Sequence, residues 1–149
     1  MMIGLMLLAV LSGMALSTQA AINSQLGKKV GMLDTALVTF GFGLIINAVL
    51  IAFFEGQHKV SLLAVPKWQL MGALFGIIYI LMMVVAVPKI GVAIATVTII
   101  FGQMSMSLVI DTFGWLGNTP IAFNYWRLLA IMCIGLALVS IYLSNKRLE

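Results

Sequence analysis

Five long apolar runs restrict this chain more than any other feature of its sequence. Each run has about the 20 residues that an α-helix needs to cross the hydrocarbon core of a bilayer. The runs cover residues 2–22, 32–54, 68–87, 91–110 and 125–143. Strands of a membrane barrel would instead alternate apolar and polar side chains over about 10 residues. The sequence therefore predicts an all-α integral membrane protein with five transmembrane helices.

The composition argues against a soluble domain with a polar shell. Only 8% of the 149 residues are charged and 63% are hydrophobic, whereas average soluble domains carry about 25% charged residues. The connections between the runs are too short for a further domain. We therefore expect residues 1–149 to form a single five-helix transmembrane domain. The net charge of +4 arises at the ends of the runs, as is usual for membrane spans, so it does not indicate nucleic-acid binding.

The basic residues in the connections favour one orientation by a small margin. Three lie on the N-terminal side of the membrane and five on the opposite side, namely Lys59, Lys67 and Arg127 against Lys28, Lys29, Lys89, Lys146 and Arg147. The positive-inside rule then places the C-terminus inside. Because the difference is small, insertion in both orientations, or dual topology, stays open. The connections at 23–31 and 87–91 are expected to be short, and those at 55–67 and 111–124 longer.

Polar side chains form stripes along several spans. At 100° per residue, Gln19 and Asn23 share one line of the first span, and Thr96 and Gln103 share a stripe of the fourth. Such groups can simply hydrogen-bond neighbouring helices, each contributing about 0.6–2 kcal/mol. Alternatively they line a watery cavity. For Gln19 and Gln103 the cavity is favoured, since each large amide lies away from the charged ends of the chain.

Chemistry that would indicate an enzyme is missing from the sequence. No span carries an acidic or basic residue near its middle, which weakens any proton exchange through a buried carboxylate. No nucleophile–base pair, metal-ligand spacing or glycine-rich phosphate loop is present. His58 lies in a polar connection and is expected to be solvated. We therefore expect no enzymatic activity, no cofactor and no metal.

Several motifs together resemble one family of transporters. They are Gln19-Ala-Ala-Ile-Asn23-Ser-Gln-Leu-Gly27, Trp68…Gly72…Gly76…Tyr79, Val87-Pro-Lys-Ile-Gly91 and Gly102-Gln103…Ile110-Asp111…Phe113-Gly114. In this order and spacing the chain resembles the YdcZ-like branch of the drug/metabolite transporter superfamily. The resemblance implies a multi-pass protein of the bacterial inner membrane with five helices. Larger superfamily members look like two such units fused in opposite orientation, and the small multidrug exporters work as antiparallel dimers.

One departure limits what the resemblance implies. The small multidrug exporters carry an essential glutamate in the first helix, whereas the first span here has Gln19 and no acid. Cation–proton exchange through a first-helix carboxylate is therefore not expected. A small-residue edge on the last span, formed by Ala130, Cys133, Ala137 and Ser140, could contact a second copy.

The leading prediction is a small-solute exporter that acts as an antiparallel, dual-topology homodimer by alternating access. Gln19, Asn23, Thr96 and Gln103 would hydrogen-bond a neutral or weakly charged solute, and Asn47 and Tyr79 are further candidates. The expected partners are this solute, membrane lipid and a second copy of the chain. Two alternatives stay open: a small dual-topology channel, and a membrane assembly subunit that transports nothing.

Overall fold

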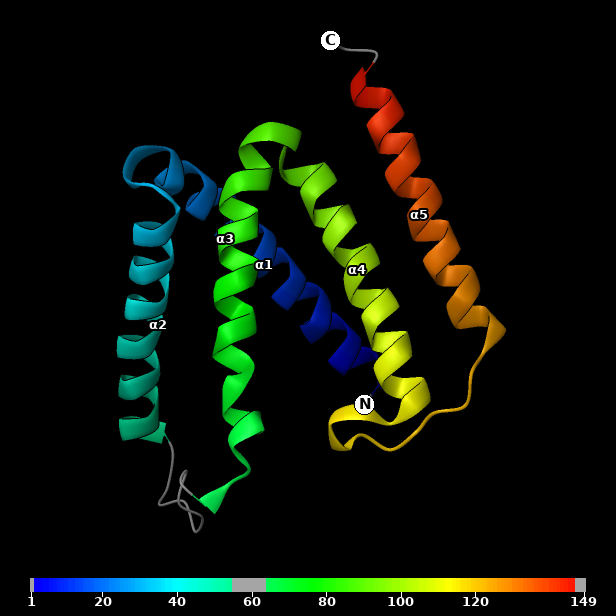
Figure 1. Cartoon of the computed structure of the whole chain (residues 1–149), viewed down its shortest axis with the longest axis horizontal. Helices are drawn as coiled ribbons and strands as arrows, with labels where there is room; N and C mark the ends of the chain where they lie inside the picture. The colour runs from blue at the N-terminus through cyan, green and yellow to red at the C-terminus, as the bar shows by residue number, and fades with distance from the viewer. Residues whose placement is uncertain (1, 55–63, 147–149) are drawn as a thin grey trace. The chain divides into compact units, whose positions relative to one another are not determined.

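The computed structural model describes residues 2–54 and 64–146, and in these ranges the chain is almost entirely helical (Figure 1). The elements are α1 Met2–Val30, α2 Met32–Phe54, η2 Lys67–Met71, α3 Gly72–Ile90, α4 Val92–Phe113, η3 Trp115–Gly117 and α5 Tyr125–Lys146. Within the described ranges, five helices are long and apolar enough to cross a membrane. The predicted five-span, all-α class is thereby confirmed. Glu55, His58 and Lys59 lie outside the described residues.

The helices group into two compact units. The first extends to Lys89 and contains α1, α2 and α3, whereas the second begins at Ile90 and contains α4 and α5. The expectation of a single domain over residues 1–149 stays a prediction.

At two places a single glycine separates consecutive helices, where the sequence predicted a connection of several residues. Gly31 lies between α1 and α2 with φ +92°, and Gly91 lies between α3 and α4 with φ +79° and ψ 160°. Glycine adopts such backbone angles readily because it has no Cβ. Both connections are short, as expected, but the bounds predicted for them, 23–31 and 87–91, were wrong, since α1 continues to Val30 and α3 continues to Ile90.

Polar residues near these glycines belong to helix ends rather than to loops. Lys28 and Lys29 occupy the last turn of α1, and Lys89 occupies the last turn of α3. Cations are stabilising there because the carbonyl end of a helix carries a partial negative charge. Pro88 also lies inside α3, where it cannot donate a backbone hydrogen bond to the carbonyl of Val84.

The connection between α4 and α5 is held at both ends. Gly114 caps α4 in the left-handed conformation, and its N–H donates to the carbonyl of Ile110. The N–H of Ile121 donates to the carbonyl of Asp111 at 2.8 Å, which folds the connection back onto the end of α4. At the start of α5, the Oδ1 of Asn124 accepts from the N–H of Trp126 at 2.8 Å, as expected of an N-cap residue.

The core of the first unit is small and depends on close helix contacts. Ala36, Ile80 and Val84 are buried there, and Phe40, Tyr79 and Leu81 pack against them. Gly27 of α1 lies so near α3 that an added Cβ would overlap Cγ1 of Val84. Small residues allow such approaches between membrane helices.

Other glycines of the spans differ in what surrounds them. A Cβ on Gly76 would lie 3.1 Å from the ring of Phe40, whereas nothing lies within 4 Å of one on Gly72. Of these two glycines, only Gly76 therefore lies in close contact with another helix.

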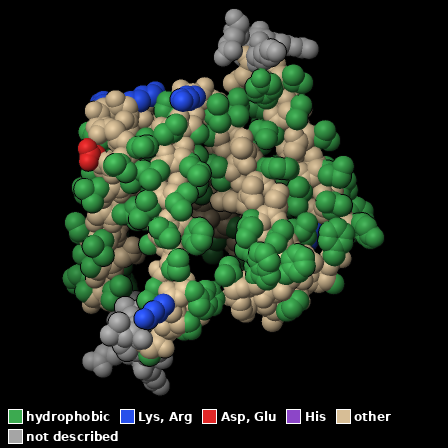
Figure 2. Space-filling view, in the orientation of Figure 1, with side chains coloured by type: hydrophobic (Ala, Val, Ile, Leu, Met, Phe, Trp, Pro, Cys, Tyr) green, Lys and Arg blue, Asp and Glu red, His purple; other side chains and the backbone are tan. Residues whose placement is uncertain are grey.

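In the second unit, α4 and α5 lie side by side and run in opposite directions (Figure 1). Gly135 of α5 faces the ring of Phe101 on α4, 3.4 Å from the position of an added Cβ. Most other side chains of both helices are at least partly exposed. Figure 2 shows hydrophobic side chains along the helices, and Lys and Arg near helix ends. Lipid or another polypeptide must cover so much exposed apolar surface.

Candidate functional site

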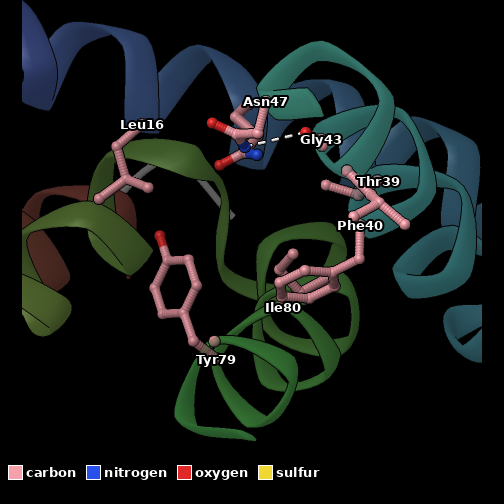
Figure 3. A pocket seen from close by; sticks show the side chains of 10 residues that line it. Leu16, Thr39, Phe40, Gly43, Asn47, Tyr79 and Ile80 are labelled. Carbon is pink, nitrogen blue, oxygen red and sulfur yellow. Dashed lines mark hydrogen bonds between the residues drawn. The ribbon is translucent and has the colours of Figure 1, made fainter. Parts of the chain in front are cut away.

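A pocket of about 480 Å³ lies within the first unit, between segments that span the membrane (Figure 3). Residues from α1, α2 and α3 line it: Leu16, Gln19, Thr39, Phe40, Gly43, Leu44, Asn47, Gly76, Tyr79 and Ile80. Its volume falls within the range of small-molecule sites, about 300–1,000 Å³. Three of the residues predicted to contact a solute, Gln19, Asn47 and Tyr79, therefore line the same pocket.

The polar groups of the pocket come from three different helices. Asn47 is anchored to its own helix, because its Nδ2 donates to the carbonyl of Gly43 at 2.9 Å. This bond orients the amide, whose Oδ1 can accept a hydrogen bond. In Figure 3 the hydroxyl of Tyr79 points from α3 into the space beside Leu16 and Asn47. A solute in this space would meet both donors and acceptors.

The remaining wall of the pocket is apolar. Leu16, Phe40, Leu44 and Ile80 supply aliphatic and aromatic surface. Among the described residues that line the pocket, none is an acid, a lysine, an arginine or a histidine. The arrangement suits a molecule with an apolar body and a few hydrogen-bonding groups, since apolar walls with sparse polar groups are typical of small-molecule sites.

Asn23 lies behind the pocket rather than in its wall. Its side chain is buried, and its Oδ1 accepts a hydrogen bond from Oγ1 of Thr39 at 3.0 Å. Because Thr39 does line the pocket, Asn23 holds a pocket residue of α2 against α1. Thr39 was not among the residues that the sequence selected for the site.

Thr96 and Gln103 belong to α4 in the second unit. They lie two helical turns apart, Thr96 half-buried and Gln103 exposed. Their participation in one site with Gln19 stays a prediction.

The second unit contains an ion pair that sequence reasoning missed. Nη1 of Arg127 donates to Oδ2 of Asp111 at 2.8 Å, which joins the end of α4 to the start of α5. A signal was present in the sequence. An acid at the end of one span and a base at the start of the next fall at the same level of an antiparallel helix pair.

Comparison with protein families shows which family the chain belongs to. The family model described as "Putative inner membrane exporter, YdcZ" matches residues 4–140, which include most of α1, all of α2 to α4 and most of α5. The chain belongs to the DMT_YdcZ family. No significant match was found among curated proteins or among solved structures. The resemblance noted from the sequence motifs is thereby confirmed.

Membership of the DMT_YdcZ family agrees with the structure. The family's description is that of a membrane exporter, which is a transporter rather than an enzyme. The five apolar helices found in the described residues are those of a multi-pass membrane protein.

Proposed function

We propose that this DMT_YdcZ protein exports small, uncharged or weakly charged solutes, and that the pocket of the first unit is part of its substrate site. One observation carries the proposal. Gln19, Asn47 and Tyr79 come from three different spans, yet they line one pocket whose described lining residues are uncharged. A membrane transporter needs polar groups of this kind away from lipid to replace the water that a solute loses.

We further propose that the working unit is an antiparallel, dual-topology homodimer. Five spans place the two termini on opposite sides, so a second copy in the opposite orientation supplies the inverted repeat that many transporters contain. The small basic-residue bias permits both orientations. On α5, Cys133, Ala137 and Ser140 are exposed and Ala130 is half-buried, which leaves this small-residue edge open to a partner helix.

In this proposal the substrate site lies near the membrane midplane between the two copies. Substrates of transporters with inverted repeats commonly bind at that level, and the protein opens to each side in turn. Gln103 and Thr96 of α4 are further residues proposed to hydrogen-bond the solute. The described residues that line the pocket are all uncharged, which supports a neutral solute over a cation.

Ligand binding by matched glutamine variants tests the site. A thermal-shift screen of neutral solutes on the purified protein identifies ligands, since a molecule that binds only the folded state raises its stability. Gln19→Leu should abolish the ligand-induced shift, because it removes the amide from the pocket wall. Gln25→Leu is the matched control, as Gln25 is exposed on the same helix and is not among the lining residues. Normal binding by folded Gln19→Leu protein would contradict the assignment.

Flux measurements in proteoliposomes separate the possible activities. A transporter that works by alternating access should show a saturable flux of the identified ligand, and Gln103→Leu should reduce that flux. A flux that does not saturate would favour the channel. No flux of any ligand, together with constant co-purification of another protein, would favour an assembly subunit.

A further inference from the structure

A second pocket, of about 230 Å³, lies between α4 and α5 around the ion pair. Its lining residues are Met104, Ser107, Leu108, Asp111, Arg127 and Ile131. The side chains of Arg127 and Asp111 are 38% and 27% exposed. Both charges can therefore reach a ligand without breaking the 2.8 Å bond that joins them.

The position of the pocket along the helices gives it two chemically different ends. Asp111 and Arg127 lie near the connection between α4 and α5, where Phe113, Trp115 and Trp126 are exposed. Aromatic residues of this kind gather where membrane meets water. Met104 precedes Asp111 by seven residues, or about 10 Å along a helix. The charged end of the pocket therefore lies at headgroup level and the apolar end lies within the hydrocarbon.

The ion pair offers complementary groups to a molecule that carries both charges. The guanidinium of Arg127 has five N–H donors in a planar fork that matches phosphate. The carboxylate of Asp111 has acceptor positions beyond the one that Arg127 occupies. The pair has no net charge, so a purely anionic ligand would gain from the arginine and be repelled by the aspartate.

We propose that this pocket binds a zwitterionic phospholipid with a primary ammonium headgroup. The phosphate lies on Arg127, the ammonium lies on Asp111, and the first part of an acyl chain follows Met104, Leu108 and Ile131 into the membrane. The backbone bond from Ile121 to Asp111 holds the connection in place before the lipid arrives. The assignment is independent of the solute site in the first unit.

Native mass spectrometry of the purified full chain tests the proposal. Phosphatidylethanolamine and phosphatidylglycerol of identical acyl composition are added to the protein, and the lipid retained is measured. The wild type should retain phosphatidylethanolamine about tenfold more strongly, as expected when one lipid makes a charged hydrogen bond that the other lacks. Equal retention of the two lipids would overturn the proposal.

Variants of the ion pair give a result that a merely structural role would not produce. Asp111→Asn leaves Arg127 without its counter-charge, so the preference should shift towards phosphatidylglycerol. Arg127→Gln should weaken retention of both lipids. An unchanged lipid preference in folded Asp111→Asn protein would contradict the assignment.

A third variant leaves the ion pair intact. Ser107→Leu fills the pocket and should lower phosphatidylethanolamine retention, whereas Thr98→Leu, on an exposed position of the same helix outside the pocket, should not. Soluble glycerophosphoethanolamine has the headgroup without the chains and should stabilise the protein far less than the lipid. Equal stabilisation would show an aqueous headgroup site and would overturn the lipid assignment.

Discussion

At the scale of single residues, the packing of the first unit depends on a glycine, Gly27. Gly27 brings α1 against Val84 of α3, and Val84 is itself buried in the core. The hydrogen bond between Thr39 and Asn23 joins α1 to α2 one turn away. Of these residues, Thr39 also lines the pocket, so its hydrogen bond to Asn23 holds one polar group of the pocket wall in place.

Adding one methyl group at Gly27 should therefore destabilise the protein. Gly27→Ala would force Val84 to move in a packed core, at a cost of about 1–3 kcal/mol. Gly13→Ala is the matched control, because nothing lies within 4 Å of a Cβ on Gly13 in the same helix. Its effect should be neutral or stabilising by up to about 1 kcal/mol. Thermal unfolding in mild detergent compares the two, and equal midpoints would refute the close contact.

The sequence predicted some residues of the pocket lining better than others, for a physical reason. Helical spacing shows which face of a span is polar, so Gln19 and Asn47 could be selected before their surroundings were known. Asn23 has the same chemistry and the same stripe, yet it is buried against Thr39. Only the crossing of α1 and α2 decides between wall and interior, and spacing within one span contains no information about that crossing.

At the scale of elements, four helices, α1, α3, α4 and α5, extend past the C-terminal ends of the apolar runs that predict them. The run ending at residue 22 became a helix that ends at Val30, and only α2 kept its predicted bounds. Hydropathy measures the depth of the hydrocarbon, whereas a helix ends where its backbone hydrogen bonds end. Basic residues such as Lys28 stabilise that end outside the hydrocarbon, so they extended α1 where the sequence suggested a connection.

The break between α3 and α4 should tolerate no side chain. Gly91 has φ +79° and ψ 160°, a region essentially restricted to glycine, where other residues cost about 1–3 kcal/mol. Gly91→Ala should lower the unfolding midpoint accordingly. Gly102→Ala, inside α4 with nothing within 4 Å of its Cβ, should not. If both variants melt like the wild type, the turn is not held in this conformation.

At the scale of the whole molecule, the basic residues bear on orientation in the membrane. The five apolar helices of the described residues predict termini on opposite sides, and the count of three basic residues against five favours one direction by a small margin. Arg127, one of the three, forms an ion pair with Asp111 in the folded chain. Acidic residues have little influence on insertion, so we keep Arg127 in the count and expect a mixed population with the C-terminus mostly inside.

Cysteine labelling measures that mixture. Cys133, which is exposed, is first replaced by serine, and single cysteines are then placed at either terminus and labelled from each side of the membrane. Two or three lysines added between residues 55 and 66 should raise the fraction with that connection inside, because basic residues in short connections set orientation. The same lysines at the C-terminus are the control and should act in the opposite direction. A single orientation in every variant would exclude the dual-topology dimer.

The one-residue turns at Gly31 and Gly91 also determine where the chain can tolerate insertions and deletions. An extra residue at either turn would rotate or displace a whole helix, because only one residue separates the two hydrogen-bonded helices there. The helices on either side of residues 55–66 and 114–124 are farther apart in the sequence, so an addition there need not rotate or displace a helix. Insertions and deletions among homologues, and any epitope placed within the chain, should therefore accumulate on the N-terminal side of the membrane and be rare on the other.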